Sequence, residues 1–170
     1  PMIIEAQSIQ INVTTTDEKD ITFNSFEELK KTNFANLKEV KMHTNDQVQL
    51  EEALLKKLLI EANQLECLEI KEVGIPTFPE LSAENKSLKT LVLRLNNLTK
   101  LPDNIGYFSA LQTIDIYNPI TEIPNSFINL QQLEKLKFEG AELIVFPEQV
   151  FALSKLKSLI ISQFDTKNKI

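Results

Sequence analysis

Residues 88–110 read LKTLVLRLNNLTKLPDNIGYFSA, and this stretch decides the fold. Leu91 and Leu93 alternate with their neighbours in the two-residue period of a β-strand that buries one face. Pro102 fixes φ and removes an N–H donor, so the chain beyond the strand is predicted to return as an extended segment or a short 3₁₀ turn rather than a helix. One strand and one return are too short to bury their own apolar face, so the stretch requires neighbours of the same kind.

The same unit recurs along the chain. Four prolines, each preceded by an apolar residue, lie 23, 22 and 23 residues apart; they are Pro79, Pro102, Pro124 and Pro147. Upstream of them runs the pattern apolar-x-x-apolar-x-apolar, whose copies start at Leu37, Leu65, Leu88, Leu111, Leu133 and Leu156. A fixed period of this length predicts stacked units that share one core and contribute one strand each to a parallel sheet.

The clearest copy resembles the leucine-rich repeat (LRR) family in the form L-x-x-L-x-L-x-x-N-x-L-x-x-L-P-x-x-I. The matching residues are Leu88, Leu91, Leu93, Asn96, Leu98, Leu101, Pro102 and Ile105. The resemblance is closest to short Leu-Pro repeats of bacterial and intracellular LRR proteins. It implies an α/β solenoid, a right-handed superhelix with a parallel β-sheet on the concave face and extended, 3₁₀ or helical returns on the convex face.

The asparagine of the family pattern is kept unevenly. Asn96 matches the family pattern fully, and Asn45 is at the equivalent position of its own repeat. Asn118 comes one residue early, in the 22-residue repeat. Val73, Ala141 and Phe164 replace it elsewhere, so a weakened ladder of asparagine hydrogen bonds is expected.

The chain is predicted to be a single LRR domain, 1–170. Residues 1–36 form an N-terminal capping segment, with a hairpin of residues 9–13 and 21–23 and a short helix at 25–31 that Ser25 caps. Residues 37–64 form a long repeat whose return, 50–64, has helical period. Four short repeats fill 65–155, and 156–170 hold a terminal strand and a C-cap that starts at Phe164 and is expected to suffice as a short polar tail. The alternatives are that further repeats are missing from this sequence or that another chain continues the array.

Few catalytic chemistries are compatible with the composition. The net charge of −6 argues against a nucleic-acid surface, and Cys67 and His43 are the only cysteine and histidine, so no cysteine-rich or multi-histidine metal site is expected. If these two lie on adjacent strands they are offset by four residues, or about 13 Å, far beyond the reach of a nucleophile and its base. The expectation is no enzyme activity, no cofactor and no metal.

The outward positions of the strands form the predicted binding surface, because the inner curve of a solenoid is the usual binding face of repeat proteins. Val92, Arg94, Leu95 and Tyr117 stand out, since interfaces favour Tyr and Arg anchors beside apolar neighbours. The wider predicted partner-binding set on the concave face adds Asp115, Lys71, Glu69, Lys137 and Glu139. The alternative interpretation is that these are scattered surface residues that need no explanation.

These features predict a non-catalytic protein–protein interaction module that acts as a monomer. Lys-rich, Arg-poor composition suggests a low-GC bacterial genome, and a secreted or surface protein that contacts a host is compatible with the sequence. The alternatives are the recognition part of a larger enzyme or effector and a structural or self-associating array. No membrane-spanning run and no secretory signal are seen, which leaves secreted, cell-surface and cytoplasmic locations open.

Overall fold

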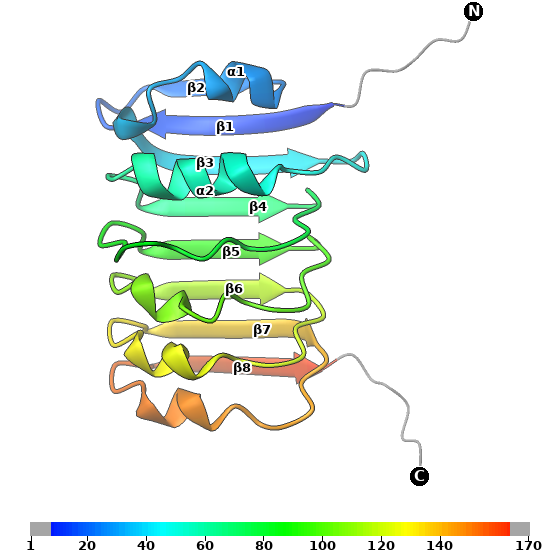
Figure 1. Cartoon of the computed structure of the whole chain (residues 1–170), viewed down its shortest axis with the longest axis vertical. Helices are drawn as coiled ribbons and strands as arrows, with labels where there is room; N and C mark the ends of the chain where they lie inside the picture. The colour runs from blue at the N-terminus through cyan, green and yellow to red at the C-terminus, as the bar shows by residue number, and fades with distance from the viewer. Residues whose placement is uncertain (1–7, 164–170) are drawn as a thin grey trace, which may run out of the picture.

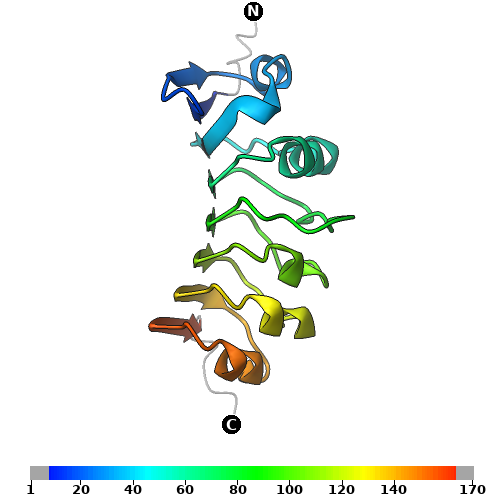
Figure 2. The ribbon, with the colours of Figure 1, turned by 90° about the vertical axis from the view of Figure 1, so that its left-hand side faces the viewer.

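An eight-stranded sheet runs the length of the molecule. The returns of the coils, with their helices and 3₁₀ turns, stack along one face of this sheet (Figures 1 and 2). The structure, a computed structural model, describes residues 8–163. The strands lie in the order β2-β1-β3-β4-β5-β6-β7-β8. Their bounds are β1 Ile9–Thr15, β2 Asp20–Phe23, β3 Leu37–Thr44, β4 Cys67–Lys71, β5 Thr90–Arg94, β6 Thr113–Tyr117, β7 Lys135–Ala141 and β8 Ser158–Gln163.

Strands β3 to β8 are parallel neighbours, one for each repeat start that the sequence pattern marks. Because the spacing of the repeats is nearly constant, equivalent residues fall opposite one another, as Leu91 does with Leu68 and with Ile114. The expected α/β solenoid with a sheet on its concave side is thereby confirmed.

The N-terminal end is closed by an antiparallel hairpin, as predicted. β1 pairs with β2 on one side and with β3 on the other, both antiparallel. The short helix α1 (Phe26–Lys30) begins after Ser25, whose side chain accepts a hydrogen bond from the backbone N–H of Glu28. Leu29 and Phe34 are buried beneath this segment, so the first coil does not expose the core.

The secondary structure of each return depends on whether it contains a proline. The repeat without a proline forms the helix α2 (Glu52–Glu61), as its 3.6-residue period predicts. The returns after Pro102, Pro124 and Pro147 contain only 3₁₀ turns. The 3₁₀ segments of the chain are η1 Phe34–Asn36, η2 Ile105–Tyr107, η3 Asn125–Asn129 and η4 Glu148–Ala152. Neither α1 nor α2, nor any other helix in residues 8–163, has the length and apolar character to cross a membrane.

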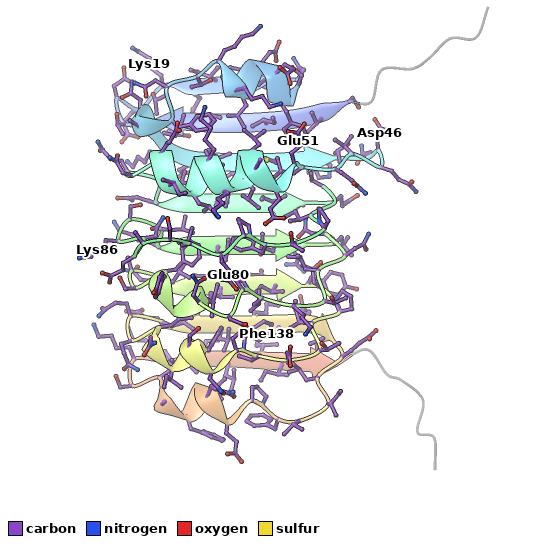
Figure 3. All side chains as sticks on the ribbon, in the orientation of Figure 1. Lys19, Asp46, Glu51, Glu80, Lys86 and Phe138 are labelled. Atoms are coloured by element: carbon purple, nitrogen blue, oxygen red, sulfur yellow. The ribbon has the colours of Figure 1, made fainter. Side chains whose placement is uncertain are left out.

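The core is a continuous row of apolar side chains between the sheet and the returns. Phe108, Phe127 and Phe138 are among its largest members with no exposed surface. Phe127 and Phe138 pack with ring centroids 6.1 Å apart, which ties a return to the strand that follows it. In Figure 3 Phe138 lies within the outline of the coils, whereas Lys86 and Asp46 lie at the rim.

The asparagine ladder has two rungs, Asn96 and Asn118. The Asn96 amide donates to the carbonyls of Ile70 and Val73, and the Asn118 amide donates to that of Leu93. Asn118 Oδ1 also accepts from the Asn96 backbone N–H at 2.8 Å. Asn118 therefore joins the ladder although it comes one residue early in sequence.

Other ladder positions behave differently from the sequence pattern. Asn45 was expected at a matching place, but it is exposed, whereas the preceding Thr44 is buried. Thr44 Oγ1 donates to the carbonyl of Ser8 and accepts from the N–H of Asp46. Val73 and Ala141 fill their places with buried apolar side chains.

The last coil departs from the expected core. Leu159 was predicted to be an inward core residue, yet it is 40% exposed, because no further coil packs on β8 within residues 8–163. The predicted C-cap, Phe164 and the residues after it, lies outside the described residues.

Candidate functional site

The solvent-facing side of β3 to β8 presents its side chains in straight columns. The strand register aligns a middle column of Lys41, Glu69, Val92, Asp115, Lys137 and Ile160. A second column aligns His43, Lys71, Arg94, Tyr117 and Glu139. The predicted site residues other than Leu95 thus share one face, and Leu95 follows directly after Arg94 at the end of β5. We call Val92, Arg94, Leu95 and Tyr117 the central patch.

Arg94 is the hub of this face. Its guanidinium bonds Asp115 at 3.1 Å and Glu139 at 2.9 Å, reaching across the two strands that follow β5. The guanidinium also lies over the Tyr117 ring, 5.6 Å from the centroid, in a cation–π contact. Arg94 is therefore held in one position by two carboxylates and one aromatic ring.

Glu139 has a second cationic neighbour. Lys137 Nζ lies 2.9 Å from its carboxylate, and this contact, with a smaller share from Arg94, lowers the pKa of Glu139 below its usual value. Two cations and two anions thus cancel in the cluster of Arg94, Lys137, Asp115 and Glu139. Since half-exposed ion pairs contribute little to stability, the main effect of the cluster is to orient Arg94.

Leu95 lies in a backbone conformation that costs free energy. Its φ is 55°, in the left-handed region, and its side chain is 51% exposed. For a non-glycine residue this region is unfavourable by about 1–2 kcal/mol. The turn is held because the Leu95 N–H donates to the Tyr117 carbonyl at 2.8 Å. An exposed leucine is therefore presented beside Tyr117 at a cost in stability.

Asp115 carries a second local cost. Its Oδ2 accepts from Arg94, but its Oδ1 is buried and no donor among residues 8–163 reaches it. A covered acceptor without a donor costs about 1–3 kcal/mol. Leu95 follows β5 directly and Asp115 lies on β6, so both residues adjoin Arg94.

The remaining predicted site residues lie at the border of this cluster. Lys71 and Glu69 pair with each other one strand before Arg94. The sequence identified which side chains share the face, but it missed that Arg94 is ion-paired and that Leu95 is left-handed. The left-handed conformation of Leu95 did have a sequence signal, namely a glycine at the equivalent position of a later repeat. That glycine, Gly140, has a φ of 65°.

Cys67 and His43 are separated as the sequence argument expected. Cys67 lies opposite Glu39 and His43 lies opposite Lys71, so the two are four residues apart along the strands. Burial, aided by the nearby carboxylate of Glu39, raises the pKa of the Cys67 thiol. In the part of the chain that the structure describes, no three His, Cys, Asp or Glu residues are grouped so as to hold a metal ion.

Comparison with known proteins supports the fold. The chain is similar to a solved LRR protein of Leptospira interrogans, with a TM-score of 0.57 and 30% sequence identity. The match covers 66% of this chain and 29% of the Leptospira protein. No protein-family model and no curated protein gives a match. The molecule thus has an LRR-like fold.

Proposed function

We propose that the protein is a non-catalytic interaction module whose central patch binds a partner protein. The LRR-like fold supports this, because solenoids use their concave face for recognition. The observation that carries the proposal is that Arg94 is held by Asp115 and Glu139 and lies over the Tyr117 ring on the solvent-facing side of the sheet.

The chemistry of the central patch indicates what kind of partner surface fits it. Tyr117 and Arg94 are residue types that anchor interfaces, and Arg94 is already oriented before binding, so less side-chain entropy is lost. Leu95 and Val92 supply apolar surface beside them. Because the charges of the cluster cancel, we expect an association rate that depends only weakly on salt.

The proposal is tested by site-specific photo-cross-linking. Tyr117 is replaced by p-benzoyl-phenylalanine in one sample and Tyr107 in another. Tyr107 is a matched control, since it is 44% exposed but lies in η2 on the return side. In lysates, the 117 probe is expected to give a discrete cross-linked protein that the 107 probe does not give. Equal labelling by the two probes would contradict the proposal.

A further inference from the structure

The acidic and basic side chains on the solvent-facing side of β3 to β8 neutralise one another almost throughout. Each strand position that carries a charge has an opposite charge on the same strand or on a neighbouring one, so the face presents little net charge to a partner. The paired residues are Glu39 with Lys41, Glu69 with Lys71, and Arg94 and Lys137 with Asp115 and Glu139.

Lys135, the first residue of β7, is the exception on this face. Its side chain is exposed, and no carboxylate of residues 8–163 lies within ion-pair distance of its ammonium group. Glu134 is adjacent in sequence, but its carboxylate bonds Lys157 at 2.9 Å. Among the Lys, Arg, Asp and Glu residues at the solvent-facing positions of β3 to β8, Lys135 alone is therefore left without a counter-charge in the described structure.

The surroundings of Lys135 suit a carboxylate. Lys137 lies two residues further along the same face of β7, about 7 Å away, and adds a second positive charge. Thr113 lies directly opposite Lys135 on β6, and its half-buried side chain carries a hydroxyl group that can donate a hydrogen bond. A carboxylate over Lys135 would thus meet one ammonium group directly, with a second cation and a hydroxyl donor close by.

The other side of the same face has the opposite charge. Glu72 and Glu142 follow directly after the ends of β4 and β7, and both are exposed. A carboxylate of a bound partner would be repelled where the strands end and attracted where β7 begins. Charge complementarity therefore favours one orientation of an acidic partner residue across the face.

We propose that the partner protein of the central patch presents an aspartate or glutamate side chain to Lys135. This inference rests on the proposed function and adds to it the chemistry of the partner. Lys135 lies four residues before Glu139, which is directly opposite Tyr117, so about 13 Å along the strands separate the two contacts. An extended partner segment would carry its carboxylate about four residues from the apolar or aromatic side chain that packs on Tyr117.

The first test is selection from a library of random peptides of about 12 residues, which span about 40 Å when extended. Peptides selected on the full chain are expected to carry Asp or Glu about four residues from an aromatic or large apolar residue. Lys135→Glu should replace that acidic preference with Lys or Arg. Lys56→Glu is the matched control, because Lys56 is also exposed and has no ion pair in residues 8–163, but lies on α2 on the return side. This variant should select the same peptides as the wild type.

The second test is a double-mutant cycle on one selected peptide. Its acidic residue is replaced by the corresponding amide, and Lys135 is replaced in Lys135→Gln. Because exposed ion pairs contribute little, either change alone should weaken binding about two- to fivefold, measured by calorimetry. The two changes together should weaken binding no more than either one, since both remove the same contact. Urea unfolding of Lys135→Gln, expected to match the wild type, shows that the fold is unchanged.

The outcomes separate this inference from the proposed function. Peptides that lose affinity with Tyr117→Glu but show no acidic preference would overturn the role of Lys135 and leave the central patch standing. An acidic preference that persists in Lys135→Glu, or additive effects in the cycle, would overturn it as well. If no selected peptide is sensitive to Tyr117→Glu, the inference fails, and the cross-linking experiment decides the central patch separately.

Discussion

Leu95 lies at a turn position that requires a left-handed residue in several repeats. At the corresponding strand exits the chain uses Glu72 and Gly140, both also with positive φ. The turn thus requires a left-handed residue in several repeats, and only one of them uses glycine, which adopts it without cost. A leucine at this position leaves apolar surface exposed at the end of β5, next to Arg94.

We predict that Leu95→Asn stabilises the protein by about 0.5–1 kcal/mol, because asparagine tolerates the left-handed region. Leu95→Ala is the control: it removes the same apolar surface but keeps the strain, so it should not stabilise. Urea unfolding of the three proteins measures this directly. A destabilised Leu95→Asn protein would show that the leucine side chain has a structural role.

Asn118 is the residue on which the middle of the ladder depends. Its buried side chain contacts the backbone of Asn96, Leu98 and Leu93. We expect Asn118→Ala to cost about 2–3 kcal/mol in the free energy of unfolding, because these groups would be left without partners. Asn45→Ala, at the exposed matching place, should change it by less than about 0.5 kcal/mol. Similar losses for both would contradict the two-rung ladder.

At the scale of elements, the returns stack closely because one of them contains a glycine. A Cβ on Gly106 would lie 2.4 Å from the Ser126 carbonyl oxygen and 2.9 Å from Asn129 Cβ. Both belong to the 3₁₀ turn η3 of the next repeat. The distance between η2 and η3 is thus set by the absence of a side chain at position 106.

Gly106→Ala should therefore destabilise the protein by about 2 kcal/mol or more, because backbone in η3 must shift. Gly74→Ala is a matched control, since its Cβ would meet the flexible Gln49 side chain at 3.1 Å. We expect that change to lie within about 1 kcal/mol of zero. Thermal or urea unfolding distinguishes the two, and a tolerated Gly106→Ala would show that the returns are not in tight register.

The elements were predictable because repetition gives the same information several times. Proline spacing located the returns, and the period of residues 50–64 located α2. What one repeat does differently was not predictable from the pattern. Asn118 enters the ladder because its short repeat moves it into register, which depends on the path of the neighbouring coil rather than on position in the motif.

The sequence predicted which residues of the candidate site share one face of the sheet, but it did not predict the contacts among their side chains. Strand alternation put Arg94, Tyr117 and Glu139 on one side of the sheet, and the register aligned them. The ion pairs of Arg94 could not be read from the sequence, because long side chains choose among several partners on adjacent strands. The exposure of Leu159 was missed because the sequence pattern is identical whether or not a further coil follows.

At the scale of the whole molecule, the solenoid has two distinct surfaces with different properties. The concave face carries a charge-compensated central patch, and the last described coil exposes apolar side chains such as Phe146 and Phe151.

The most direct test of the central patch is the affinity of the cross-linked partner for matched tyrosine variants. Tyr117→Glu should weaken binding at least about tenfold, since it removes the ring under Arg94 and adds a charge at the centre of the patch. Tyr107→Glu, on the return side, should change it less than about twofold. Measured by calorimetry on folded proteins, that difference is the predicted result. Equal affinities for wild type and Tyr117→Glu would contradict the central patch as the binding surface.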